Sequence, residues 1–147
     1  DRLAAATHAQ RIKVLGSTNG RGFDERTEQM LGETAQLLLE RYSGDLRRLR
    51  DEADRDPQRE RALLKQCSGL GDHGVDAFFR EVQVAWPELV PFADRRARMS
   101  AQRLGLPRDE RRLARLTGAA DWPRLAVALV RVDLASDHDA VIAAAGE

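Results

Sequence analysis

Residues 56–76 read DPQRERALLKQCSGLGDHGVD, and the way this stretch folds separates two classes of protein. Gly69, Gly71 and Gly74 match the spacing G-x-G-x-x-G of a dinucleotide-binding loop, which requires a β-strand before its first glycine. The residues in front of Gly69 contain no β-branched side chain and begin with Asp-Pro, a typical helix start. The stretch therefore predicts a helix, a turn at residues 68–73 and a second helix.

Helical spacing of apolar residues recurs along the rest of the chain, whereas β-branched residues are sparse and nowhere alternate over a full strand. We therefore predict an all-α fold, a compact bundle of seven or eight short helices. It forms a single domain over residues 1–135, and residues 136–147 form a frayed tail. The expected helices cover residues 3–16, 24–44, 45–53, 56–68, 72–86 and 94–104, a short one from residue 109, and residues 121–132.

The composition excludes several kinds of protein. The 147 residues are enough for one domain with its own core, and 24 basic residues balance 24 acidic ones. Contact with a nucleic acid then depends on local clusters of charge rather than on a basic tail. The single cysteine, Cys67, excludes a cysteine zinc site and a four-cysteine iron–sulfur cluster. The longest apolar run, Leu125–Val130, is too short to span a membrane, so we expect a soluble protein with no membrane partner.

The glycines at the turn have two interpretations. Gly69 and Gly71 can both take positive φ, and without side chains there the backbone N–H groups can approach a phosphate oxygen closely. The N-terminus of the following helix adds a partial positive charge, so such a turn can hold a DNA backbone without reading its sequence. The alternative is an ordinary connection between two helices, because helices often end in glycine.

Leu64–Val75, which reads LKQCSGLGDHGV, resembles the helix–hairpin–helix of the endonuclease III-type DNA glycosylases, whose pattern is roughly L-P-G-V-G-x-K-T-A. Asp94, within Pro91–Arg96, lies 20 residues after Gly74 and matches the place of that family's catalytic aspartate. Residues 78–97, FFREVQVAWPELVPFADRRA, also look like a bacterial branch of this superfamily. The likeness extends from about Arg11 to Leu134.

This resemblance implies a base-excision repair protein without an iron–sulfur cluster, located in the bacterial cytoplasm and associated with the nucleoid. Its partner is double-stranded DNA, held mainly by the phosphate backbone, and the opening helices of the family's domain lie upstream of Asp1. Ser68 lies at the position of the family's hairpin proline, and His73 lies at the position of its Schiff-base lysine. The implied activity is therefore a monofunctional DNA N-glycosylase. The resemblance implies no cofactor, apart from a monovalent cation that the hairpin can accommodate.

The resemblance also implies the site residues. Asp94 is the catalytic carboxylate, which stabilises positive charge on the sugar or activates water, and His73 contacts the flipped base or a phosphate. Each has a structural alternative, because Asp94 is well placed to cap a helix and His73 is typical of a solvated first turn. The implied DNA contacts are Ser68, Gly69, Leu70, Gly71, Asp72 and Gly74, followed by Arg95, Arg96 and Arg98.

Residues 94–115 hold eight arginines and three acidic residues, which gives a local charge of +5 on a neutral chain. This segment is either an electropositive face for DNA or a solvated helix surface. The sequence leaves three functions open. They are an active glycosylase, a non-catalytic helix–hairpin–helix module that binds DNA, and a helical protein-interaction domain.

Overall fold

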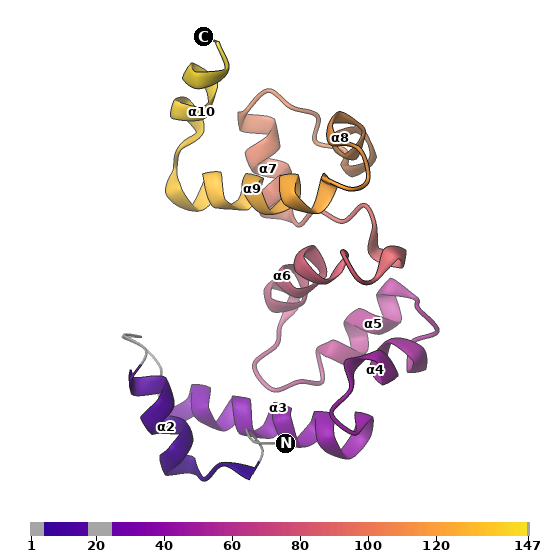
Figure 1. Cartoon of the computed structure of the whole chain (residues 1–147), viewed down its shortest axis with the longest axis vertical. Helices are drawn as coiled ribbons and strands as arrows, with labels where there is room; N and C mark the ends of the chain where they lie inside the picture. Colours follow the sequence, from indigo (N-terminus) through magenta and orange to yellow (C-terminus); the bar gives the residue numbers. More distant parts are fainter. Residues whose placement is uncertain (1–4, 18–24, 147) are drawn as a thin grey trace. The chain divides into compact units, whose positions relative to one another are not determined.

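The structure is a computed structural model that describes residues 5–17 and 25–146, and within these ranges it contains helices and no strand (Figure 1). The all-α prediction is confirmed for this part of the chain. The starts expected at residues 3 and 24 lie outside the described residues. Within these ranges there are nine α-helices instead of seven or eight, and a 3₁₀ helix, η1 (Pro87–Leu89). The α-helices are α2 (His8–Ser17), α3 (Glu25–Tyr42), α4 (Leu46–Glu52), α5 (Pro57–Leu64), α6 (Asp72–Val82), α7 (Arg95–Arg103), α8 (Glu110–Thr117), α9 (Trp122–Ala135) and α10 (His138–Ala145).

The chain divides into two compact units, residues 1–75 and residues 76–147, with the boundary inside α6. Each unit is described here by its own packing. The expected single domain over residues 1–135 stays a prediction. Among the helices of the described ranges, none has both the length and the apolarity to cross a membrane.

Helices α4 and α5 of the first unit each begin after an aspartate cap, whereas the cap expected for α3 at Asp24 lies outside the described residues. The Asp45 carboxylate accepts a hydrogen bond from the backbone N–H of Arg47 at 3.0 Å, and Asp56 accepts bonds from the N–H groups of Gln58 and Arg59 at 2.9 Å. The Arg47 side chain also bonds to Asp45 and lowers its pKa to about 2. The buried apolar residues of this unit are Tyr42, Leu49, Ala53, Leu64, Cys67 and Val75.

The second unit is built around the crossing of α7 and α9 (Figure 1). Alanines on α7 let α9 approach closely, and the indole of Trp122, which is completely buried, fills the space beside them. The Asp109 carboxylate caps α8 by accepting from the N–H of Arg112 at 2.9 Å. The main core cluster of this unit is Ala93, Ala97, Ala101, Leu113, Trp122, Ala126, Leu129 and Val130.

A buried glutamine ties the segment after α6 to α9. The amide of Gln83, which is only 2% exposed, donates to the carbonyls of Arg80 at 2.9 Å and Phe92 at 3.1 Å. Its oxygen accepts from the N–H of Phe92 at 3.1 Å and from Nε1 of Trp122 at 2.9 Å. The helix expected to reach Trp86 ends instead at Val82, and residues 83–85 form a turn around this amide.

The C-terminal residues form a helix where the sequence predicts a frayed tail. Ser136, with φ of +61°, ends α9, and α10 follows after Asp137. Ser100 on α7 is completely buried, and its Oγ lies 2.9 Å from Nε2 of His138 at the start of α10. The side chains of α10 after His138 are exposed although most of them are apolar, so the sequence pattern of this helix does not indicate a packed face.

Candidate nucleic-acid interface

The turn between α5 and α6, residues 65–71, is hereafter called the glycine turn. It is closed by backbone hydrogen bonds from Cys67 N–H to the Leu64 carbonyl at 3.0 Å and from Leu70 N–H to the Cys67 carbonyl at 3.1 Å. Gly69 has φ of +78°, as predicted, and a Cβ there would lie 2.5 Å from Sδ of Met30. Glycine is therefore required at position 69 for both its backbone conformation and its contact with α3.

The other two glycines serve the structure differently. Positive φ was also predicted for Gly71, and this is wrong, because the residue does not adopt it. A Cβ on Gly71 would meet no atom within 4 Å, so the space in front of this residue is open. A Cβ on Gly74 would lie 2.6 Å from Cδ1 of Leu70, which folds back over the first turn of α6. Of these three glycines, Gly71 is therefore the one where an added side chain would disturb the fold least and would instead alter the exposed surface of the turn.

Helix α3 holds the glycine turn in place. Oγ1 of Thr34 donates to the backbone carbonyl of Ser68 at 3.2 Å. The Ser68 side chain hydrogen-bonds to Glu33 and, with Gln29, lowers the pKa of that carboxyl. The hydroxyl of Ser68 is therefore engaged within the protein, and the turn is positioned before any ligand arrives.

Charged side chains of both signs flank the turn. Nζ of Lys65 lies 2.9 Å from Oδ1 of Asp72, and Nη1 of Arg61 lies 3.8 Å from the same oxygen. The hydrogen bond from Lys65 holds the pKa of Asp72 below its usual value. Asp72, Lys65 and His73 are all exposed. The Lys65–Asp72 pair therefore joins the first residue after α5 to the first residue of α6 and partly neutralises the acid at the N-terminus of α6.

We expect Lys65→Met to raise the pKa of Asp72 towards its usual value, because the largest cause of its depression is removed. The stabilising effect of this pair is present above the unfolded pKa of an aspartate and is lost as the pH falls through the folded pKa. The measurement is an NMR pH titration of the Asp72 carboxyl carbon. Lys13→Met, the change of the other lysine, is the control and should leave this titration unchanged; an unchanged Asp72 pKa in Lys65→Met would contradict the pairing.

Asp94 lies in the second unit as the N-cap of α7. Its Oδ1 accepts from the N–H of Ala97 at 2.7 Å, and its Oδ2 is paired with Nη1 of Arg80. The residue is 8% exposed, and the Arg80 side chain is 14% exposed. The capping role is confirmed, and the catalytic role of Asp94 stays a prediction. Any chemistry at this carboxylate requires that one of its two oxygens turn away from these partners.

The arginines after Asp94 are for the most part bound within the unit. Nη1 of Arg96 lies 3.5 Å from Asp133 on α9, and Nη1 of Arg98 lies 3.7 Å from Glu110 on α8. Burial raises the pKa of Glu110, and Arg98 opposes this effect. Arg95 is exposed and has no ion-pair partner among the residues that the structure describes. Of the three arginines expected to contact DNA, two therefore connect α7 to its neighbours.

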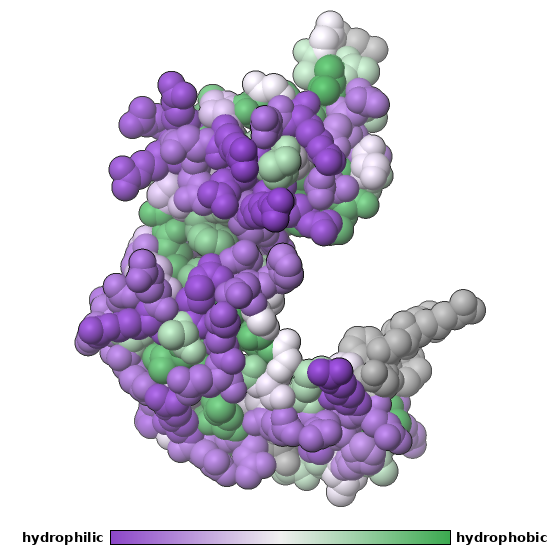
Figure 2. Space-filling view, turned by 180° about the vertical axis from the view of Figure 1, so that it is seen from behind, coloured by the Kyte–Doolittle hydropathy of each residue, from purple (hydrophilic) through white to green (hydrophobic). Residues whose placement is uncertain are grey.

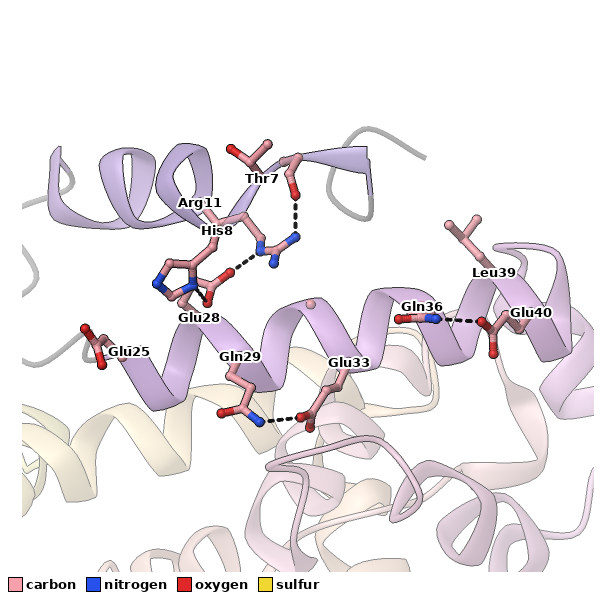
Figure 3. Close-up of a pocket in the computed structure, with 12 residues that line it drawn as sticks. Thr7, His8, Arg11, Glu25, Glu28, Gln29, Glu33, Gln36, Leu39 and Glu40 are labelled. Atoms are coloured by element: carbon pink, nitrogen blue, oxygen red, sulfur yellow. Dashed lines mark hydrogen bonds and ion pairs between the residues drawn. The ribbon is translucent and has the colours of Figure 1, made fainter.

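A groove with a volume of about 770 Å³ lies in the first unit between α2 and α3 (Figure 3). Figure 3 shows His8 and Arg11 of α2 pointing at Glu28 of α3, whose carboxylate is almost completely buried and is paired with both. Glu25, Glu33 and Glu40 also line the groove. No motif in the sequence pointed to these residues as a site. Because the lining carries more acid than base, the groove repels phosphate and is not the nucleic-acid interface.

Residues 5–17 and 25–146 contain no group of three or more His, Cys, Asp and Glu side chains arranged to hold a metal ion. The glycine turn lies in the first unit, and Asp94 with Arg95, Arg96 and Arg98 lies in the second. Comparison with protein families, with curated proteins and with solved structures finds no significant match to this chain.

Proposed function

We propose that this chain binds the phosphate backbone of duplex DNA through the glycine turn and the first turn of α6. The observation that carries the proposal is the pair of glycines, one fixed at φ of +78° against Met30 and the other facing open space. A backbone that bends sharply and carries no side chain at its outer residue lets a phosphate oxygen reach the N–H groups at the start of α6.

The chemistry of the turn suits a phosphodiester better than a base. Backbone N–H groups and a helix N-terminus attract a negative charge but do not distinguish one base pair from another. Lys65 and Arg61 lie beside Asp72 and offset the repulsion that its carboxylate would exert on a phosphate. The proposal therefore describes binding that depends on salt and not on sequence.

Replacement of Gly71 by Val is expected to weaken binding to every duplex sequence by about tenfold, the loss of one or two hydrogen bonds to a charged group. The new side chain enters open space, so the fold is kept while the phosphate is held away. The measurement is fluorescence anisotropy with two 20-base-pair duplexes of different sequence, at low salt.

Two further variants make this test specific. Ala119→Val places the same Val side chain in an exposed turn of the second unit and should leave affinity unchanged. Gly69→Val is expected to lower stability as well as affinity, because position 69 has positive φ and contacts Met30. Unchanged affinity in Gly71→Val, with the fold intact by circular dichroism, would refute the role of the turn.

Base excision is the second candidate function, and the geometry of Asp94 favours it. Excision of a damaged base needs a carboxylate held near the sugar, where it stabilises the positive charge that develops as the glycosidic bond breaks. The cap to Ala97 and the pair with Arg80 hold Asp94 in a single orientation at the N-terminus of α7. The Oδ2 atom of Asp94, which is paired with Arg80, would then turn to the sugar.

A further inference from the structure

Helix α8 carries three arginines on a single face. Arg111, Arg112 and Arg115 are exposed, and Leu113 between them is completely buried in the core of the second unit. At 3.6 residues per turn, the three arginines fall within an arc of about 100° that lies opposite Leu113. The burial of Leu113 therefore turns this set, hereafter the α8 arginine face, towards solvent. Arg108, also exposed, precedes the helix.

The acidic residues of α8 do not neutralise this face. The Asp109 carboxylate caps the helix by accepting from the N–H of Arg112 at 2.9 Å. Glu110 points inward, where it lies 3.4 Å from the N–H of Ala93 and 3.7 Å from Nη1 of Arg98. Within residues 76–146, no side-chain hydrogen bond or ion pair engages the guanidinium groups of the α8 arginine face.

The arginines of α7 contrast with those of α8. Arg96 and Arg103 both pair with Asp133, at 3.5 and 3.1 Å, and Arg98 pairs with Glu110. The local excess of positive charge in residues 94–115 is therefore concentrated on α8. In the reversed view of Figure 2, strongly hydrophilic side chains project from the side of the second unit that carries α8.

We propose that the α8 arginine face is a second contact for the phosphate backbone of duplex DNA, an inference that rests on the DNA binding proposed for the glycine turn. Three unpaired guanidinium groups on one short helix repel one another, and a polyanion removes this repulsion. A guanidinium group can donate two parallel hydrogen bonds to a pair of phosphate oxygens. It is also weakly hydrated, so it loses little hydration free energy on contact. Arg111 and Arg115 lie about 6 Å apart along the helix axis, within reach of neighbouring phosphates on one strand.

The test compares two triple variants of the full chain with the wild type. In the first, Arg111, Arg112 and Arg115 are all replaced by Gln, which has a similar helix propensity. In the control, Arg96, Arg103 and Arg124 are replaced by Gln, which removes the same charge from paired arginines of the same unit. Affinity for a 20-base-pair duplex of mixed sequence is measured over a range of salt concentrations, and circular dichroism checks each fold.

The α8 variant is expected to bind more than tenfold more weakly at low salt. The slope of log K against log salt concentration should be smaller in magnitude by about 2–3, because each lost phosphate contact contributes about 0.9 to that slope. The control should change this slope by less than about 1. A wild-type slope in the α8 variant would overturn the proposal, and a flattening in the control alone would assign the contact to the arginines of α7 and α9. If the wild type binds poly-glutamate as tightly as DNA, and the α8 variant loses that binding, the partner is an acidic protein instead.

Gly71→Val, measured in parallel, separates this proposal from the proposed function. Loss of affinity in Gly71→Val together with a wild-type slope in the α8 variant would overturn only the α8 contact. The reverse pattern would overturn the role of the glycine turn and leave the α8 contact standing. A wild type that binds no duplex at low salt would overturn both.

Discussion

Exchange of Asp94 for Asn is expected to slow base excision by about 10²- to 10⁴-fold, the usual contribution of a positioned catalytic carboxylate, with DNA affinity nearly unchanged. Asn is as good an N-cap as Asp, so the bond from the N–H of Ala97 is kept and only the negative charge is lost. The measurement is the single-turnover rate of base release from duplexes that contain damaged bases. Because the resemblance to the DNA glycosylases places His73 at the position of their Schiff-base lysine, we expect borohydride to trap no covalent adduct.

Arg80→Met is the matched control for this experiment. Both variants break the buried Arg80–Asp94 pair, but only Asp94→Asn removes the carboxylate. A loss of rate in Asp94→Asn that Arg80→Met does not share assigns Asp94 to the chemistry. Equal losses in both variants would mean that the carboxylate acts only by holding α6 and α7 together. A chain that releases no damaged base in any form would leave DNA binding through the glycine turn as the function.

Replacement of Gln83 by Met is expected to lower the free energy of unfolding by about 3 kcal/mol. Met has a similar volume but leaves the N–H and carbonyl of Phe92 and the indole N–H of Trp122 without their partner. Each buried polar group without a partner costs about 1–3 kcal/mol. Urea denaturation followed by tryptophan fluorescence measures this change, because Trp122 lies in the affected core.

Gln102→Met is the corresponding control, because Gln102 lies on α7 and is exposed. We expect its effect to stay within about 0.5 kcal/mol, the usual range for a surface substitution. A loss of less than 1 kcal/mol in Gln83→Met would show that the amide network is not what joins the segment after α6 to α9.

Much of the secondary structure could be predicted from local pattern. Asp45, Asp56, Asp94 and Asp109 were each expected at or next to a helix start, and each accepts a backbone N–H bond there. These predictions succeed because a cap involves atoms within three residues of one another, so the sequence itself contains all the participants. Asp72 and Asp121 are exceptions, since Asp72 is the first residue of α6 and pairs with Lys65, and the Asp121 carboxylate pairs with Arg124 at 3.1 Å.

The candidate site could be predicted only in part. The sequence predicted a turn at residues 68–73 with positive φ at Gly69, and the observed turn covers residues 65–71, because α5 ends earlier, at Leu64. The partners of the turn did not, because Met30 and Thr34 are more than 30 residues away along the chain from Gly69 and Ser68. The arginines of residues 94–115 looked alike in the sequence, and only the positions of Asp133 and Glu110 distinguish those of α7 from those of α8.

The sequence by itself determined that this protein is helical, where most helices begin and where the chain turns on glycine, because these properties depend on neighbouring residues. The tertiary structure alone decided which charges are paired, since an ion pair such as Arg80–Asp94 joins elements whose approach depends on the packing of the whole unit. It also decided that Gln83 ends α6 at Val82 and that His138 holds α10 against Ser100. A buried polar side chain needs a hydrogen-bond partner, and that partner can come from a residue far away along the chain, so the local sequence pattern does not predict it.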